Sequence, residues 1–522
     1  MRLEPALNGG LRKSIVCAAL AVVATAGVAQ QGAGTSAAPT KAETRITKDQ
    51  AKELFRSVDE ILGFVSKDTG LPIEHPVKRK MISREEVNKY LKQKFNEDEG
   101  TKRLERSEIV LKKFGLLDRD FHLQSFLVTL LTEQIAGFYD NKTKTVSLLD
   151  WIQPEEQKPV LAHELTHALQ DQKVGLTKWS DVETPGIARD VQEDNRHIQT
   201  DEAETAREAV AEGQAMVSFV DYTLKPAGKT LLDAPELLDR FKDAAADTSG
   251  SPVLARAPLL LQESLLFPYS EGLSFEDAVL TKAGRAAAFA GTLENPPSSS
   301  FEILHPVAYM SHAPVPVLRL PDLHPLLDAE YTPYDVGVMG ELDVRILTEL
   351  FGGQEMSKAI TPAWDGGVYY AVQRKSAVTA EARTSTASLG LLYYARWKSA
   401  AAARAFLRMY AAELPRQYSG VVRRDKDEAN ASEQIYSTNE GDVLLSISGD
   451  NVYVGEGFPL ALSRTLRDRV AEAQSSGPIE QAAGSPAMMP LHDPALALSR
   501  TLSSFGMMKA AMLQRYTFVQ RD

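Results

Sequence analysis

The chain has 522 residues and a formal net charge of −12, with 43% apolar and 25% charged residues. These proportions are typical of globular proteins, so the sequence excludes a chain that is disordered throughout. Its length predicts two or three packed units. The acidic residues are spread along the chain, which argues against nucleic acid or an anionic membrane as the main partner.

The first residues have the pattern of an export signal. Arg12 and Lys13 precede an apolar run, and an Ala/Gly/Thr-rich stretch follows at 30–45. We predict a secretory signal peptide at 1–29, a linker at 30–45, and a periplasmic or secreted protein. The alternative is a membrane anchor, but about 15 apolar residues are fewer than the roughly 20 that a spanning helix needs, and no later segment is predicted to span.

Cysteine chemistry is excluded from the mature chain. Cys17 is the only cysteine, and it lies within the predicted signal peptide. Neither disulfides, a cysteine nucleophile nor cysteine zinc ligands are therefore expected after export.

Apolar spacing predicts an N-terminal helical region at 46–130, and a polar turn predicts a hairpin between Phe138–Asp140 and Thr145–Leu149. The helices predicted in that region are 48–64, 82–95, 103–115 and 121–135. Further helices are expected around 160–170 and at 201–224, the latter ending before a proline and a glycine. Together these elements predict a core unit at 131–235.

The residue pattern changes within the second half of the chain. Residues 236–360 are predicted to be mostly helical and to wall a cleft, whereas short strands around a helix at Ser399–Leu414 predict a small α/β unit at 361–470. Residues 471–522 are predicted to be a flexible link and a terminal helix. The predicted fold class is therefore α+β.

The stretch VLAHELTHALQDQ, residues 160–172, carries the strongest chemical signal. On a helical wheel His163, Glu164 and His167 share one side, and the apolar residues occupy the other. Imidazoles one turn apart can both bind one zinc ion, while the adjacent glutamate can act on a water that the metal has acidified to a pKa of about 7. The alternative is that the histidines are polar residues on a solvated helix face.

A catalytic zinc site needs a third protein ligand. A third histidine in the extended H-E-x-x-H pattern is absent, because Gln170 and Val174 stand at its glycine and histidine positions. The candidates are Glu208 and Glu212, one turn apart on the helix predicted at 201–224. Gly213, which costs roughly 1 kcal/mol relative to alanine inside a helix, predicts a close helix crossing there. The alternative is that both acids form a solvated face.

The H-E-L-T-H motif followed by Glu212-Gly213-Gln214-Ala215 resembles the gluzincin class of zinc metallopeptidases. The resemblance covers about a fifth of the chain, 130–225, and implies a zincin-like catalytic unit that binds one zinc ion through His163, His167 and Glu212, with Glu164 as general base. Glu208-Ala-Val-Ala-Glu212 also resembles the E-x-x-x-D arrangement of other gluzincins, which makes Glu208 the alternative third ligand. The long separation between His167 and Glu212 leaves the subfamily unassigned.

Other candidates have weaker signals. Peptide hydrolysis needs a donor for the developing oxyanion, and His305 and Tyr309 have suitable chemistry, as does His197. The stretch LLFPYSEGLSF, residues 265–275, contains Tyr269 among other aromatics near Pro268. Such aromatics either line a substrate cleft or pack in the core near a turn, and the core is the commoner case.

The sequence thus predicts an exported zinc metallopeptidase, a hydrolase acting on peptides or proteins. Two alternatives remain: a cell-envelope binding or assembly factor with a structural metal or none, and a zinc hydrolase of a non-protein amide or ester. A fourth protein ligand that closes the coordination sphere would favour the binding factor, since structural zinc sites are closed. The sequence predicts neither the cleavage specificity nor the oligomeric state.

Overall fold

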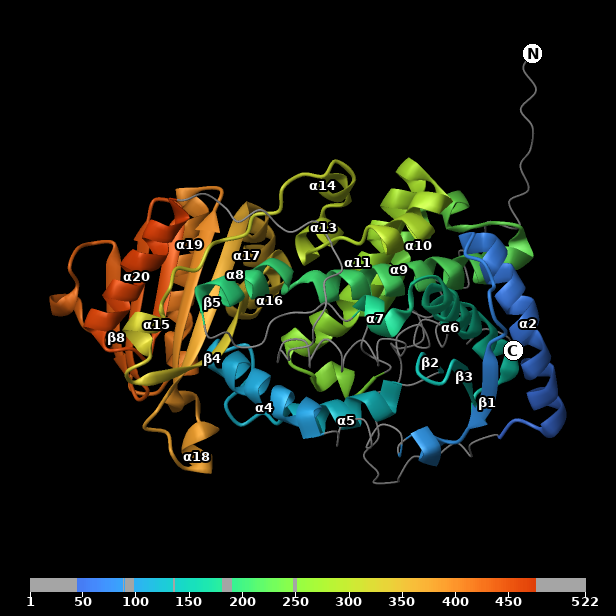
Figure 1. Ribbon diagram of the computed structural model, residues 1–522, viewed down its shortest axis with the longest axis horizontal. Helices are drawn as coiled ribbons and strands as arrows, with labels where there is room; N and C mark the ends of the chain where they lie inside the picture. The colour runs from blue at the N-terminus through green and yellow to red at the C-terminus, as the bar shows by residue number, and fades with distance from the viewer. Residues whose placement is uncertain are drawn as a thin grey trace, which may run out of the picture.

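A computed structural model describes residues 45–87, 89, 98–134, 137–180, 190–246 and 251–475. The predicted signal peptide, almost all of the linker and the terminal segment after residue 475 lie outside these ranges, as does much of the helix predicted at 82–95. The described part combines a mainly helical half with a half built on a large sheet, so the predicted α+β class is confirmed (Figure 1).

Four long helices form the centre of the helical half. They are α2 (Lys48–Thr69), α6 (Pro154–Val174), α9 (Ala203–Leu224) and α11 (Leu259–Ala283). Helix α6 packs against both α2 and α9, and α9 packs against α11. The order α2, α6, α9, α11 therefore puts the two predicted motif helices next to each other in the middle of the unit (Figure 1).

Shorter elements complete the helical half. They are α4 (Asp98–Lys113), α5 (Leu123–Gln134), α7 (Leu176–Ser180), α8 (Val191–Thr200), α10 (Glu236–Ala246), the π-helical turn η4 (Ala287–Gly291), α12 (Thr292–Glu294), α13 (Ser300–Leu304) and α14 (Pro306–Met310). None of the helices in the described ranges is long and apolar enough to cross a membrane.

A three-stranded sheet lies beside α6. Its order is β1-β3-β2, in which β3 (Thr145–Leu149) pairs antiparallel with β2 (Phe138–Asp140) and parallel with β1 (Lys78–Ile82). The predicted hairpin is thus confirmed. Strand β1 was not predicted, because three of its five residues are exposed and basic and give no alternating apolar signal.

The second sheet is antiparallel, with the order β4-β5-β6-β10-β9-β8-β7. Its strands are β4 (Tyr331–Val338), β5 (Trp364–Arg374), β6 (Leu389–Trp397), β7 (Val422–Arg423), β8 (Glu433–Thr438), β9 (Gly441–Ser448) and β10 (Asn451–Glu456). The accompanying helices are α15 (His324–Leu327), α16 (Glu341–Gly352), α17 (Gln354–Ile360), α18 (Ala380–Arg383), α19 (Ala400–Gln417) and α20 (Leu460–Gln474).

Both faces of the large sheet are buried. Along β5, Tyr369 and Ala371 belong to the core shared with the helical half, whereas Val368 and Tyr370 belong to a second core that includes residues of α20. This alternation is the period of two expected of a strand. Since β4 pairs with β5, the sheet begins about thirty residues before the unit predicted at 361–470, within the region predicted to be mostly helical.

Helix α6 begins with Pro154 at its first turn and ends at Gly175, whose backbone is left-handed with φ 68°. All residues from Val160 to Asp171 are buried. Neighbouring elements therefore cover both the apolar face of this helix and the face that carries His163, Glu164 and His167.

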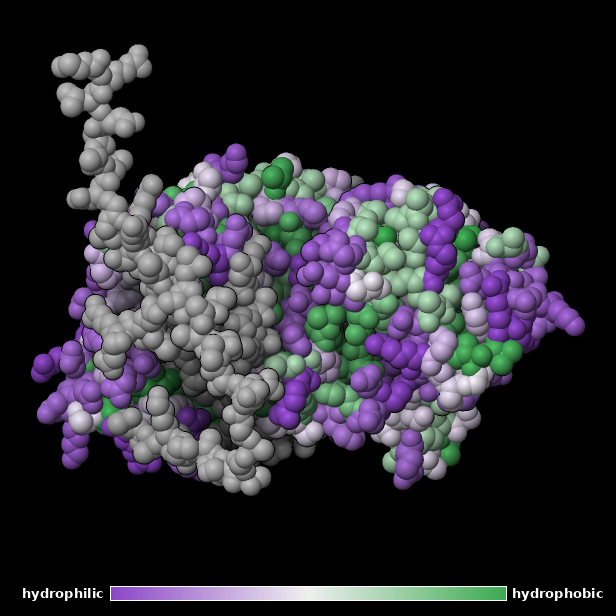
Figure 2. All heavy atoms as spheres, turned by 180° about the vertical axis from the view of Figure 1, so that it is seen from behind, coloured by the Kyte–Doolittle hydropathy of each residue, from purple (hydrophilic) through white to green (hydrophobic). Residues whose placement is uncertain are grey.

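The outer surface mixes polar and apolar residues. Figure 2 shows this for the face opposite to that of Figure 1, with hydrophobic patches between hydrophilic ones. The large apolar side chains that are exposed in the described ranges are Ile73, Leu232, Val307, Val378 and Val422. They come from separate parts of the chain.

Candidate metal centre

Helices α6 and α9 bring three side chains together. His163 Nε2 and His167 Nε2 are 3.1 Å apart, and Glu212 Oε2 lies 3.1 Å from the first and 3.4 Å from the second. All three residues are buried. They are the only group of three or more His, Cys, Asp or Glu in the described ranges whose ligand atoms converge in this way, so this site can hold a metal ion.

Burial and mutual charge set the protonation of this group. Burial lowers the pKa of His163. It also opposes ionisation of Glu212 and His167, but their attraction to each other is stronger: the pKa of Glu212 falls to about 2 and that of His167 rises to about 9. Glu212 is therefore a carboxylate without metal, and a cation at this site competes with the proton on His167.

Glu164 faces the same region from α6. Its Oε2 accepts a hydrogen bond of 2.9 Å from the backbone N–H of Tyr139 in β2, and its Oε1 is buried without a hydrogen bond. Burial raises the pKa of Glu164 to about 8 in the metal-free protein. The hairpin is also tied to α6 through Asp171, which accepts from the Tyr139 hydroxyl at 2.7 Å and from Lys144 at 2.6 Å.

The close helix crossing predicted from Gly213 is confirmed. A Cβ atom on Gly213 would overlap the backbone carbonyl of Gly272 in α11, and a Cβ on Gly272 would overlap the carbonyl of Ala209 in α9. The backbones of α9 and α11 are thus in contact next to Glu212. Only glycine permits this approach, which sets the distance between α11 and the metal centre.

Tyr269 is the residue near the metal centre whose importance the sequence did not reveal. It lies inside α11, so the turn expected around Pro268 is not present. Its ring stacks on that of His163 with centroids 6.1 Å apart, and its buried hydroxyl lies close to the carboxylate of Glu212. Burial, followed by the charges of Glu212 and Glu208, raises its pKa well above the usual value. The neutral hydroxyl can therefore act as a donor beside the three converging ligand atoms.

The predicted oxyanion donors lie in other settings. His305 Nε2 is 2.7 Å from a carboxylate oxygen of Glu341, and the Tyr309 hydroxyl donates to the carbonyl of Asn295 at 2.6 Å. His197 Nε2 lies 3.3 Å from Asp201. None of the three belongs to the converging metal group, and their proposed role stays a prediction.

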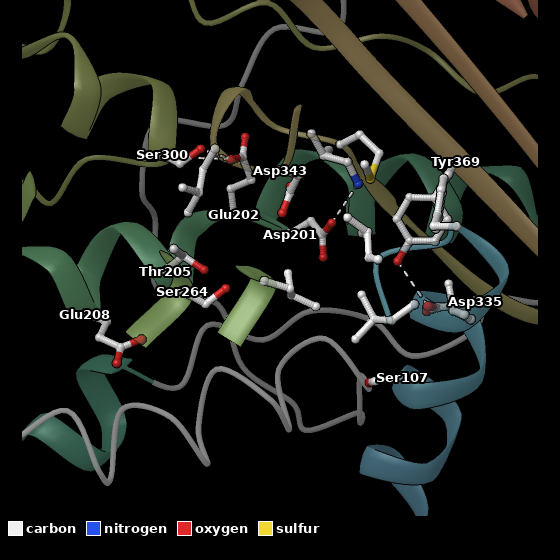
Figure 3. A pocket seen from close by; sticks show the side chains of 18 of the residues that line it. Ser107, Asp201, Glu202, Thr205, Glu208, Ser264, Ser300, Asp335, Asp343 and Tyr369 are labelled. Atoms are coloured by element: carbon white, nitrogen blue, oxygen red, sulfur yellow. Dashed lines mark hydrogen bonds between the residues drawn. The ribbon is translucent and has the colours of Figure 1, made fainter. Parts of the chain in front are cut away.

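Glu208, the alternative third ligand, is not in the converging group. It lines a neighbouring cavity of about 170 Å³ (Figure 3). The acidic residues around this cavity are Asp201, Glu202, Glu208, Asp335 and Asp343. Burial raises the pKa of Glu202 to about 8 and that of Asp343 to about 7, so both tend to keep a proton near neutral pH. Glu212 is thus the acid that meets both histidines.

Comparison of this chain with protein-family models, curated proteins and solved structures finds no match. The resemblance to gluzincins therefore depends on the motif residues alone. The solvated-face interpretation of the histidines is wrong, since both are buried, and so is that of Glu212.

Proposed function

We propose that this chain is an exported zinc-dependent metallopeptidase that hydrolyses peptide bonds. The observation that carries the proposal is the convergence of His163, His167 and Glu212 next to a second buried glutamate, Glu164. Two imidazoles and one carboxylate are a known ligand set of catalytic zinc in hydrolases.

The ligand set supports zinc in a catalytic rather than a structural role. Structural zinc sites are closed by four protein ligands, whereas catalytic sites use three. Among the described residues the converging group has three members. Imidazole nitrogen with a single carboxylate also suits zinc better than calcium or magnesium, which prefer oxygen ligands throughout. These features argue against the alternative of a binding factor with structural metal.

The chain's own residues have distinct roles in this proposal. Bound zinc supplies Lewis acidity, which polarises a carbonyl and acidifies a water molecule. Glu164 takes the proton of the attacking water and passes it to the leaving amine. The N–H of Tyr139 holds the Glu164 carboxylate in place through one oxygen, which leaves the other for the proton.

Tyr269 is the donor that we assign to the charge developing on the substrate carbonyl. Its hydroxyl is buried beside Glu212 and belongs to a ring stacked on His163. A donor held ready in a site of low polarity stabilises developing charge without reorganisation. His305 and Tyr309 already interact with Glu341 and Asn295.

The test is cleavage of a mixed peptide library by the zinc-loaded chain from Gln30 onward. Glu164→Gln should retain zinc and lose cleavage by about 10²–10⁴-fold. The matched control is Glu156→Gln, which makes the same change on the first turn of α6 and should cleave like the parent.

Three results would count against the proposal. Cleavage by Glu164→Gln at the parent rate would remove Glu164 as the base. A parent that binds zinc but cleaves no peptide, while it hydrolyses simple amides or esters, would favour the non-protein substrate. A parent that binds zinc and hydrolyses neither would favour the binding factor.

A further inference from the structure

A chain of buried hydrogen bonds leads away from the metal centre on the far side of His167. His167 Nδ1 lies 2.8 Å from Oε1 of Gln170, one turn later in α6. Gln170 Nε2 donates across to α9, to the carbonyl of Ala211 at 2.9 Å and to Oε1 of Gln214 at 3.0 Å. Both glutamines have no exposed surface, so water does not compete for these bonds.

The chain continues into the π-helical turn η4. Gln214 Nε2 lies within 3.0 Å of the carbonyls of Ala288 and Phe289, and 2.8 Å from the hydroxyl of Thr292. That hydroxyl also lies 3.1 Å from Glu276, a fully buried residue of α11. Turns of this wide type are rare inside helices and are often found at functional sites. Here the turn presents backbone carbonyls to a side chain from another helix.

The donor and acceptor of every hydrogen bond in this series follow from groups that can only accept. The carbonyls of η4 require the N–H groups of Gln214 to point toward them, which turns its Oε1 toward Gln170. The Ala211 carbonyl and that Oε1 then take both N–H groups of Gln170. Its remaining oxygen faces His167, so His167 Nδ1 must carry the proton.

The consequence reaches the metal centre. An imidazole with its proton on Nδ1 has a free electron pair on Nε2, and His167 Nε2 is the atom that faces His163 and Glu212. Metal-binding histidines are commonly oriented in this way by a carboxylate or a backbone carbonyl. In this chain a glutamine does so, and its own orientation is set by a second glutamine.

We propose that Gln170 and Gln214, the glutamine pair, are positioning residues that hold His167 in the tautomer with Nε2 free for the metal. The backbone carbonyls of Ala211 and η4 fix the direction of the pair. This inference needs the metal site but not the peptidase activity, since it concerns how the chain binds a cation.

The test measures zinc affinity of the full chain by competition with a chromophoric chelator. Gln170→Met keeps the size of the side chain and removes its hydrogen bonds, and it should weaken zinc binding about 10–100-fold. Gln214→Met should weaken binding less, since it acts through Gln170. The double variant should bind as Gln170→Met does, because Gln214 has no effect once Gln170 is lost.

Gln157→Met is the matched control. Gln157 is buried in the same helix and also bonds backbone carbonyls, those of Leu149 and Ile152, so its loss should lower the folding stability. It does not touch the metal centre, and zinc affinity should stay at the parent value. Equal weakening in Gln157→Met and Gln170→Met, or full additivity in the double variant, would overturn the proposal.

A second measurement uses the parent and needs no stable variant. In zinc-loaded protein with ¹⁵N-labelled histidine, assigned with His167→Gln, the Nδ1 of His167 should carry a proton that exchanges slowly with solvent. In Gln214→Met the exchange should be faster, and in Gln157→Met unchanged. A proton on Nε2 of His167 in the parent would overturn the proposal. Failure of the parent to bind zinc would overturn both proposals, whereas zinc binding without cleavage would overturn the peptidase alone.

Discussion

The metal centre and the C-terminal sheet both bury acidic side chains, but the partners of these side chains differ. In the sheet, Glu433 has both oxygens bonded to Arg464 and Arg467 as well as to a backbone N–H, and Glu456 accepts from Tyr410 and Tyr418.

At the metal centre, by contrast, Glu164 Oε1 is buried without a hydrogen bond, and Glu212 Oε2 meets the ring nitrogens of His163 and His167. Unsatisfied buried polar groups cost free energy, so folding alone does not favour them. The acidic side chains of the sheet region thus hold the fold together, whereas Glu164 at the metal centre keeps one carboxylate oxygen available.

The largest expected effect is the loss of the carboxylate ligand. Glu212→Ala should weaken zinc binding by more than the roughly 100-fold upper range for groups that only orient a ligand. Glu208→Ala, one turn earlier on α9, should change it little, because Glu208 is outside the converging group. Zinc titration of both variants decides between the two acids. A larger loss in Glu208→Ala would assign the third ligand to Glu208.

An ion pair between the two halves should give the next largest effect, on stability alone. Lys113 in α4 has no exposed surface, and its Nζ lies 2.9 Å from Glu440 of the sheet region. Glu440→Gln leaves this cation buried with a weaker partner and should lower the free energy of unfolding by about 3–5 kcal/mol. Denaturant unfolding measures it.

The same pair separates stability from function. Adding Lys113→Met to Glu440→Gln should recover part of the loss, because the stranded charge is removed. Zinc affinity should not change in either variant. A zinc affinity that falls together with stability would mean that the metal centre depends on the contact between the two halves.

The site residues differ in how far the sequence could predict them. His163 and His167 are one helical turn apart, so local spacing was enough to pair them. Glu212 lies on a different helix, so its prediction needed another signal. Gly213 supplied it, because a glycine inside a helix is unfavourable unless another backbone must approach closely. That clue predicted a close crossing at Gly213 but not its partner, α11.

Tyr269 and the glutamine pair lacked any such local signal. The role of Tyr269 depends on the helix against which α11 packs. The spacing of apolar residues does not predict which helices pack together. The direction of Gln170 is set by the carbonyl of Ala211, 41 residues later, and through Gln214 by the carbonyls of Ala288 and Phe289. Strand β4 was missed because its partner, β5, lies beyond two intervening helices. Tertiary contacts, rather than local preferences, determine these features.

The helix crossing should give a smaller effect than the ion pair. Gly213→Ala adds a methyl group where the α9 and α11 backbones touch, which should lower the free energy of unfolding by about 1–3 kcal/mol and weaken zinc binding through Glu212. Gly63→Ala in α2 is the matched control. It has open space around the new methyl group and should stabilise by about 0.4–1 kcal/mol. A neutral Gly213→Ala would remove the crossing as the device that positions Glu212.

The two regions should also differ in the pH dependence of their stability. Burial, reinforced by Asp343, raises the pKa of Glu202 to about 8, so between pH 4.5 and 8 the unfolded chain has released a proton that the folded chain keeps. Stability from this group is complete below pH 4.5 and is lost as the pH rises through 8. Burial also acts to raise the pKa of Glu433, but Arg464 and Arg467 outweigh it and hold it at about 2, so its contribution is lost as the pH falls from 4.5 toward 2.

Thermal unfolding of the metal-free protein from pH 3 to 9 tests this difference. Glu202→Gln should flatten the decline of the unfolding midpoint between pH 4.5 and 8 and leave the decline below pH 4.5 unchanged, because the amide stays neutral where the carboxyl must ionise. Glu433→Gln should do the reverse. If Glu202→Gln altered only the acid side, Glu202 would be ionised in the folded protein, and the cavity beside the metal centre would be stabilising charge as the sheet region does.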